Sequence, residues 1–299
     1  MGAKRVGLWL GAAIVAALLG FALWRSGLTA PPPPGAPAAT AQAAQLPDLP
    51  EVPARKESAQ VSYGRPAQAD WVKDFEALKE RAKAGDAVAQ RLLAETYDGC
   101  YMVNFDREGF FKDVQVRRGM LGDPAHAAVL DQTAQERALR CDAVDGGAII
   151  PLALIRGWYA QAAENGDLAA RLMDNALSQK KLDAAESAKL VEEVLASNDA
   201  AAVFAIGNTV GSTYRGAPDD PLAALMIGEQ SSPAWQVAAC RMGYDCAPSS
   251  ILMGSLCLAT NACAGDGYEE FLMKSQRTDA DRRDLERRVT EILRLVEGQ

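Results

Sequence analysis

Hydrophobic residues change their pattern twice along the chain. Residues 6–24 form an unbroken apolar run, and residues 30–60 show no hydrophobic periodicity. From Asp70 onward, apolar side chains recur at helical spacings of three and four. These patterns predict a membrane-length helix, then a tether, then an all-α domain. The predicted division is a cytoplasmic segment 1–5, a transmembrane helix 6–24, a linker 25–69 and a helical domain 70–299.

The first apolar run has the length of a transmembrane helix. At about 1.5 Å per residue it would extend ~28 Å, close to the hydrocarbon thickness of a bilayer. Lys4 and Arg5 precede the run, and basic flanks favour a cytoplasmic N-terminus. For a bacterial chain, this predicts a single-pass inner-membrane protein with residues 70–299 in the periplasm.

A cleaved signal peptide is the alternative interpretation. The apolar core of a signal peptide is about 7–15 residues long and ends in a small-residue cleavage site. This run is longer and ends at Trp24-Arg25, although an Ala-x-Ala sequence follows at 36–38. We therefore favour an uncleaved anchor. Gly7 and Gly11 form a GxxxG motif inside it, which would allow two spans to pack closely as a homodimer.

Residues 25–69 have the composition of an extended linker. They include four consecutive prolines and many alanines. Such a segment favours polyproline-like conformations and cannot bury a core. We expect it to hold the helical domain away from the membrane.

Two amphipathic patterns begin the helical domain. Trp71, Phe75 and Leu78 share one helical face after Asp70, a candidate N-cap, and the next helix is predicted to end before Gly99. Together they predict an αα-hairpin. Thr278 is predicted to cap a terminal helix. The apolar stripe of that helix is Leu285, Val289, Ile292, Leu293 and Val296.

The Gly85-Asp86 turn of this hairpin recurs along the chain. Gly166-Asp167 repeats it, Asn198-Asp199 is a weaker copy and Ser232-Pro233 is a fainter one. The last two intervals have the length of a two-helix repeat, and the first is roughly twice as long. Such units bury their apolar faces by stacking, so the pattern predicts an α-solenoid. Residues 100–150 would then hold a diverged unit or an insertion.

The first two units resemble the Sel-one-like repeat, a relative of the tetratricopeptide repeat. The segments RAKAGDAVAQRLLAETYDGC and WYAQAAENGDLAARLMDNA carry the resemblance. The matching positions are Gly85, Asp86, Ala89, Leu93, Tyr97 and Gly99 in the first unit, and Ala163, Gly166, Asp167 and Ala170 in the second. The segment after Cys100 departs from the family pattern. The resemblance implies a protein-binding scaffold with no catalytic residue.

Charge and motif content argue against several other classes. The formal net charge is −8, and residues 1–25 contain basic but no acidic residues, so the rest is more acidic still. Such a body repels nucleic acid. The Gly207–Gly211 segment lacks the lysine of a phosphate-binding loop, and we interpret Asn208 and Gly211 as helix-ending residues. No cofactor is predicted.

The chain has a single histidine, His126. A Ser-His-Asp or Cys-His arrangement would have to use it, and zinc sites built from several histidines are excluded. His126 lies in a predicted helix, and no Gly-x-Ser-x-Gly sequence exists. We therefore expect a helix residue with no catalytic role and no metal site.

The chain has six cysteines, Cys100, Cys141, Cys240, Cys246, Cys257 and Cys263. An even number in an oxidising compartment predicts disulfides, and the C-x5-C spacings do not suit zinc. Cys100 with Cys141 is the natural separate pair. For the others we favour local pairs, Cys240–Cys246 and Cys257–Cys263, over the crossed pairs Cys240–Cys257 and Cys246–Cys263. Met242-Gly243-Tyr244 has the character of a turn between helices, and exported cysteine-rich relatives of the family are similar in bridging such turns.

The leading functional interpretation is a non-enzymatic periplasmic scaffold that binds a partner protein or peptide on a concave face. Tyr101, Trp158 and Tyr159 are candidate anchors, although core burial is the expected fate of Trp158. The alternative is an envelope hydrolase that acts on peptidoglycan through a carboxylate acid or base, with Glu95 as first choice. The other acidic candidates are Glu80, Asp98, Asp106, Glu192-Glu193 and Asp219-Asp220.

Overall fold

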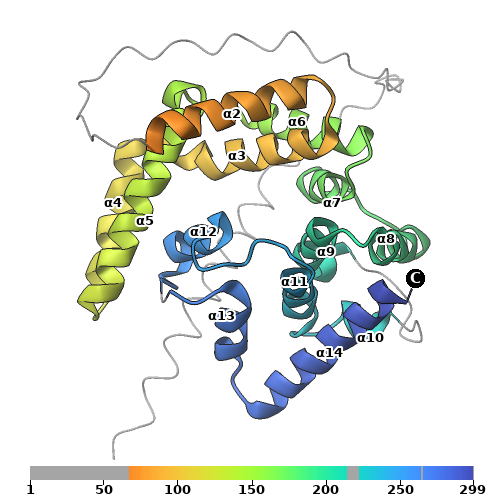
Figure 1. Ribbon diagram of the computed structural model, residues 1–299. Helices are drawn as coiled ribbons and strands as arrows, with labels where there is room; N and C mark the ends of the chain where they lie inside the picture. Colours follow the sequence, from red (N-terminus) through yellow and green to blue (C-terminus); the bar gives the residue numbers. More distant parts are fainter. Residues whose placement is uncertain (1–66, 214–221, 264, 299) are drawn as a thin grey trace, which may run out of the picture. The chain divides into compact units, whose positions relative to one another are not determined.

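A computed structural model describes residues 67–213, 222–263 and 265–298 of the chain (Figure 1). All regular structure in these ranges is helical, which confirms the all-α prediction. Residues 6–24, with Gly7 and Gly11, lie outside the described residues, as do the cytoplasmic segment and nearly all of the linker. Within the described ranges, no helix is long and apolar enough to cross a membrane.

The first two helices form the predicted hairpin, α2 (Ala67–Lys83) and α3 (Ala87–Phe105). Gly85 adopts φ +91°, a left-handed conformation that favours glycine. Asp86 then caps α3 by accepting a hydrogen bond from the Ala89 amide at 3.0 Å. The prediction that Asp70 caps α2 is wrong, because α2 begins three residues earlier and Asp70 lies within it.

Helix α3 continues through Gly99 to Phe105, so the predicted end before Gly99 is also wrong. The reason lies in a neighbouring helix. The Arg137 guanidinium donates to the Gly99 carbonyl at 3.1 Å, and a Cβ atom at position 99 would lie 3.4 Å from it. Gly99 therefore lies within α3, where its carbonyl binds a side chain of α5, and does not end the helix.

The segment 100–150 contains an inserted hairpin, α4 (Arg107–Met120) and α5 (Pro124–Ala143), followed by a short 3-10 turn (Asp145–Gly147). Helix α5 packs against α2, α3 and α4, while α3 packs directly on α6 (Leu152–Glu164). Because α3 and α6 are direct neighbours, we interpret α4 and α5 as an insertion between two hairpins and not as a diverged stacked unit.

Helices α6 and α7 (Leu168–Leu177) repeat the turn of the first hairpin. Gly166 has φ +96°, and Asp167 caps α7 by accepting from the Ala170 amide at 2.7 Å. Asn165 donates to Gln90 at 2.8 Å, which places the C-terminal end of α6 beside the start of α3. Helices α3 and α6 therefore run antiparallel.

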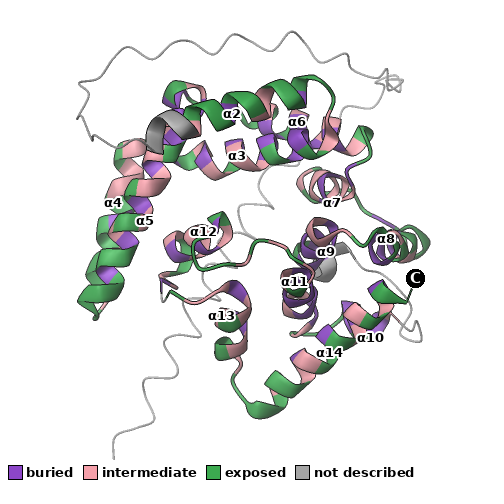
Figure 2. Cartoon of the chain, in the orientation of Figure 1, coloured by how far each residue is buried: buried purple, intermediate pink, exposed green. Residues whose placement is uncertain are grey.

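Helices α8 (Ala184–Ser197) and α9 (Ala200–Thr213) follow, and α9 packs between α7 and α11 (Ser231–Arg241). Asn198 takes the left-handed position before α9, at φ +50°. Ser232-Pro233 differs from the earlier turns, because it lies in the first turn of α11, after the short helix α10 (Ala223–Met226). Figure 2 shows buried positions concentrated on α9 and α11.

Asn208 and Gly211 lie inside α9, which continues to Thr213, so their predicted role in ending a helix is wrong. A Cβ atom at Gly207 would lie 3.1 Å from the Trp235 Cβ and 3.0 Å from the Gln236 Cγ. The glycine lets α9 and α11 approach closely. Asn208 accepts a hydrogen bond from Gln236 at 2.7 Å, which holds the same pair of helices.

The chain ends with α12 (Ile251–Thr260), α13 (Tyr268–Ser275) and α14 (Asp279–Glu297). The predicted terminal helix is confirmed, since Thr278 and Asp281 form a capping box at its start. Helix α14 packs against α8 and α11. Of the predicted stripe, Leu285, Val289, Ile292 and Val296 are buried and Leu293 is half-buried.

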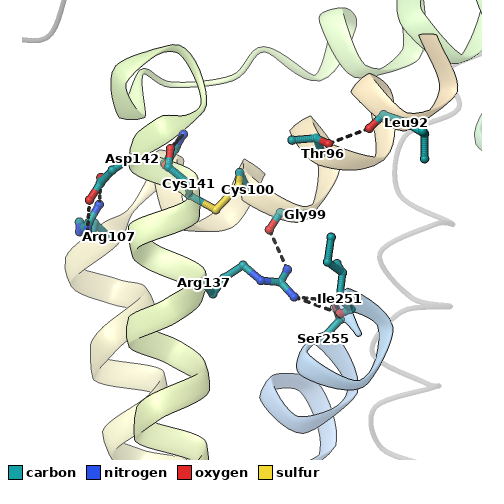
Figure 3. The surroundings of a disulfide bond; sticks show 11 residues. Leu92, Thr96, Gly99, Cys100, Arg107, Arg137, Cys141, Asp142, Ile251 and Ser255 are labelled. Carbon is teal, nitrogen blue, oxygen red and sulfur yellow. Dashed lines mark hydrogen bonds and ion pairs between the residues drawn. A yellow bond between two sulfur atoms is a disulfide. The ribbon is translucent and has the colours of Figure 1, made fainter. Parts of the chain in front are cut away.

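The cysteines form three disulfides, Cys100–Cys141, Cys240–Cys246 and Cys257–Cys263. These are the favoured pairs, and no free cysteine remains. The first bond joins α3 to α5 (Figure 3). The second closes the turn at Gly243, which has φ +101°, and the third spans the end of α12.

The inserted hairpin also contacts the C-terminal part of the domain. Figure 3 shows the Arg137 guanidinium between Gly99 on α3 and Ser255 on α12, to whose hydroxyl it donates at 2.7 Å. A small core lies beside this contact and consists of Val114, Leu130, Ala134, Cys257 and Cys263. Arg137 on α5 therefore links α3 to α12, two helices that lie far apart in the sequence.

Candidate functional site

An ion-paired arginine joins the two similar hairpins. Arg91 on α3 is 7% exposed and donates to Asp167 at 3.0 Å and to Glu95 at 2.8 Å. Asp167 uses its other oxygen to cap α7, so one carboxylate fixes both a helix start and a guanidinium. Buried arginines of this kind require paired carboxylates. Sequence reasoning missed Arg91 because its partner lies 76 positions away.

Glu95 and Asp98 lie one turn apart on α3. The Glu95 side chain is 38% exposed, yet loss of surrounding water raises its pKa, against the opposing effect of Arg91. Asp98 is exposed as well, and loss of water also raises its pKa. No ion pair to Asp98 exists among the described residues.

Tyr159 lies on α6, which packs against α3. It is 2% exposed, and its pKa is raised by burial and by the negative charges of Glu95 and Asp98. Its hydroxyl is not among the fully buried polar atoms that lack a partner, so the ring is buried while solvent reaches the oxygen. Tyr159 is therefore not an exposed anchor. Trp158 is 9% exposed, with a buried indole nitrogen that lacks a partner, and does not serve as one either.

Tyr244 reaches the same place from the loop between α11 and α12. Its ring stacks on Phe204 with centroids 4.2 Å apart. Burial, followed by the charge of Glu95, raises the pKa of Tyr244 to about 12. The disulfide Cys240–Cys246 closes the loop that carries it. We call the group of Arg91, Glu95, Asp98, Tyr159 and Tyr244 the Glu95 cluster.

Exposed apolar residues adjoin the Glu95 cluster. Val88 and Leu92 are 47% and 37% exposed and continue one face of α3 toward its N-terminal end. Ile251, 60% exposed, begins α12, which Arg137 ties to Gly99 on this face of α3 (Figure 3). The cluster thus combines one carboxylate without an ion pair, Asp98, with exposed apolar side chains.

Tyr101, the remaining candidate anchor, lies at the other end of α3. It is half-buried and stacks on Phe105 with centroids 5.9 Å apart. Met102 and Phe105 are 63% and 58% exposed. Tyr101 therefore belongs to a separate apolar surface, and no observation connects it to the Glu95 cluster.

The other candidate residues have structural roles or lie apart. His126 is an exposed residue on α5, 3.6 Å from Asp123, as expected for a helix residue. Glu80 pairs with Lys83, and Asp106 caps α4. Glu193 pairs with Arg171 and Lys189, while Asp219-Asp220 lies outside the described residues. In the described ranges, no three potential metal-ligating side chains come together.

A second depression lies beside the loop that carries Tyr244. It is open and acidic, and Arg241 at its edge is already paired with Glu269 and Glu286. Its lining includes Asp245, Gly267, Glu269, Glu270 and Met273. Of its carboxylates, Glu269 is paired with Arg241 and Glu270 with Lys274.

No protein-family model, curated protein or solved structure matches this chain. The resemblance of its first two hairpins to Sel-one-like repeats therefore stays a prediction. A functional conclusion has to come from the residues of the site.

Proposed function

We propose that this protein is a membrane-anchored helical scaffold of the bacterial periplasm, and that it binds a partner protein or peptide without catalysing a reaction. The observation that carries the proposal is the exposed face of α3, where Glu95, held by Arg91 at 2.8 Å, adjoins the exposed apolar side chains of Val88 and Leu92. Residues 6–24 would hold the domain at the inner membrane. Gly7 and Gly11 would allow a homodimer there.

The disulfides support the proposed location. Disulfides persist in exported proteins and are rare in the reducing cytosol. Three of them, with no cysteine left free, agree with a domain that folds on the outer side of the inner membrane. The apolar run and its basic flank agree with the same orientation.

The arrangement of the carboxylates favours binding over catalysis. Glu95 is held by a hydrogen bond from Arg91 at 2.8 Å, which favours its charged form. Glu95 and Asp98 stand on one side of a single helix, whereas glycoside hydrolases place two carboxyl groups on opposite sides of the scissile bond. A recessed carboxylate fixed by arginine is better suited to pairing with a ligand.

In-cell photocrosslinking tests the proposal. A photoreactive amino acid replaces Leu92, which is exposed beside the cluster, and a matched control replaces Glu108 on α4, whose side chain is 81% exposed. We expect a discrete protein adduct from position 92 that position 108 does not give. Adducts of equal amount and identity from both positions would contradict the proposal.

A peptidoglycan hydrolase is the second candidate, because a raised pKa is what a general acid requires and burial raises that of Glu95. Zymography of the full chain distinguishes the two functions. The scaffold account predicts no clearing of peptidoglycan. Clearing that is lost in Glu95→Gln and kept in Glu80→Gln would establish the hydrolase instead.

A further inference from the structure

We infer that the Cys240–Cys246 disulfide is a site of reversible thiol–disulfide exchange, which a dithiol reductant opens while the rest of the domain stays folded. This inference does not depend on the proposed function, because it concerns a covalent bond in the loop between α11 and α12 and not the face of α3. Three observations support it: access to the bond from solvent, the short loop that the bond closes, and backbone hydrogen bonds that hold the turn without it.

Access from solvent separates this disulfide from the other two. Cys240 and Cys246 are half-buried, and both line the open depression beside the loop that carries Tyr244. The other four cysteines are at most 5% exposed: Cys100, Cys141, Cys257 and Cys263. An attacking thiolate has to reach a sulfur atom directly, so access decides which disulfide exchanges first. Among the three disulfides, the bond in this depression is the one that a reductant can reach.

The loop that the bond closes is short. Cys240 and Cys246 are 6 positions apart, whereas Cys100 and Cys141 are 41 positions apart. A short closed loop restrains the unfolded chain less, so its disulfide adds less stability to the fold. Cys257–Cys263 has the same separation of 6 but is buried, so it differs from Cys240–Cys246 in access and not in loop length. It therefore serves as the matched control.

Backbone hydrogen bonds close the turn independently of the disulfide. Gly243 has φ +101°, and the Tyr244 amide donates to the Ala239 carbonyl at 2.9 Å. The Met242 amide donates to the Ala238 carbonyl at 3.0 Å in the same turn. A left-handed glycine with such bonds is a common way to end a helix. The end of α11 is therefore fixed without the sulfur atoms, and the fold does not require their bond.

The disulfide restrains the residues that follow the turn. Tyr244 stacks on Phe204 with centroids 4.2 Å apart, and the Cys246 carbonyl accepts a hydrogen bond from the Tyr268 amide at 2.9 Å, at the start of α13. Residues 247–249 are exposed. Once the bond opens, these non-covalent contacts are what holds the loop. Reduction should therefore loosen this loop and the start of α13, while the other helices keep their packing.

The exchange balances with a dithiol as its co-reactant. One thiolate of the dithiol attacks a sulfur of the Cys240–Cys246 bond and forms a mixed disulfide, and the other cysteine leaves as a thiolate and takes up a proton. The second thiolate of the reductant then displaces the remaining cysteine, which is protonated in turn. The reductant becomes a disulfide, and the chain gains two thiols. The same steps in reverse, with an oxidised disulfide as the reagent, close the loop again.

Timed reduction of the full chain in detergent tests the inference. Dithiothreitol is added, free thiols are blocked with iodoacetamide at intervals, and the alkylated peptides are identified by mass spectrometry. We expect Cys240 and Cys246 to be alkylated at least about tenfold faster than the matched control pair, Cys257 and Cys263. Equal rates for the two pairs, or faster reduction of the control pair, would overturn the inference.

A variant with both Cys240→Ser and Cys246→Ser tests whether the bond can open in the folded protein. Its circular dichroism should match that of the oxidised chain, and amide hydrogen exchange should be faster in residues 242–250 and at the start of α13. Loss of helix content across the domain would show that folding requires the bond and would contradict the inference.

Reoxidation and a second reductant complete the test. Oxidised glutathione, added after the dithiothreitol is removed, should restore the Cys240–Cys246 pair, and failure to restore it would contradict reversible exchange. Reduced thioredoxin, a protein dithiol, is compared with dithiothreitol at equal concentration. A faster reaction with thioredoxin assigns the site to a protein reductant and a slower one to small dithiols, and both results support exchange at this bond.

Discussion

Arg91 on α3 donates to Asp167, the cap of α7, at 3.0 Å, and so joins two hairpins. The two residues are 76 positions apart in the sequence. The same guanidinium bonds Glu95. The contact between the two hairpins and the geometry of the candidate binding surface therefore depend on one buried side chain. A change at Asp167 should affect both stability and binding.

Asp167→Ala should lower the free energy of unfolding by about 3–5 kcal/mol, because it leaves a buried guanidinium without its main partner. Asp86→Ala is the matched control, since Asp86 caps α3 in the same way but pairs with the exposed Arg81. Urea denaturation of both variants provides the measurement. Equal losses would mean that capping, and not Arg91, accounts for the role of Asp167.

The stability lost on removal of a disulfide should increase with the length of the loop that the disulfide closes. The sequence separation is 41 for Cys100–Cys141 and 6 for each of the other two pairs. In the chain-entropy description, serine replacement should cost about 4 kcal/mol for the first pair and about 2 kcal/mol for each short pair. Denaturant titration of the three double-serine variants tests the order. A larger loss for a short pair would show that the order is set by something other than loop length.

Asp98→Asn should stabilise the protein at neutral pH. Burial raises the pKa of Asp98 above its ordinary value of 3.8, so the folded state holds this proton more tightly than the unfolded state does. Stability therefore falls as pH rises from the ordinary value through the folded-state pKa, and asparagine removes that loss. Because Asp98 is exposed, the gain should be less than about 1 kcal/mol.

The gain should disappear at acid pH, below about pH 3, where aspartic acid is neutral in both states. Glu80→Gln is a control of opposite sign, because a hydrogen bond from Lys83 lowers the pKa of Glu80. Thermal unfolding across pH 3 to 8 provides the measurement. A destabilised Asp98→Asn at neutral pH would mean that Asp98 has a stabilising partner and is not available to a ligand.

Arg137→Met should loosen α12 from the inserted hairpin. The guanidinium donates to the carbonyls of Gly99 and Ile251 and to the Ser255 hydroxyl, and methionine keeps only the apolar stem. We expect faster amide hydrogen exchange in residues 251–260 and a loss of about 1–3 kcal/mol. Ser255→Ala removes a single one of these bonds and should have a smaller effect. Unchanged exchange in α12 would contradict a role for Arg137 in holding it.

Local chemistry explains what could be predicted from the sequence. The Gly85-Asp86 and Gly166-Asp167 turns combine a left-handed residue with a capping aspartate, and each depends only on its own few residues. The Thr278 cap is local in the same way. The local pairing of Cys240 with Cys246 follows from a turn that the glycine between them makes possible.

Non-local packing explains what could not be predicted. Gly99, Asn208 and Gly211 were interpreted as helix ends, but each lies within a helix. Gly207, beside Asn208, lies where α11 leaves little space for a Cβ atom. Tyr159 is an aromatic residue of the kind that anchors a binding partner, yet its side chain is buried in the core. The Arg91–Asp167 and Arg137–Ser255 contacts join distant segments, and no spacing in the sequence indicates them.

The measurement that tests the account most directly is the yield of the Leu92 photoadduct in cells that carry charge variants of the cluster. We predict a discrete partner adduct with the wild-type chain, less of it with Asp98→Asn, and none with Asp98→Lys, because the lysine reverses the charge of the surface beside Leu92. Glu108→Lys, on the inserted hairpin, should leave the yield unchanged. Equal yields from Asp98→Lys and the wild-type chain would contradict binding at the Glu95 cluster.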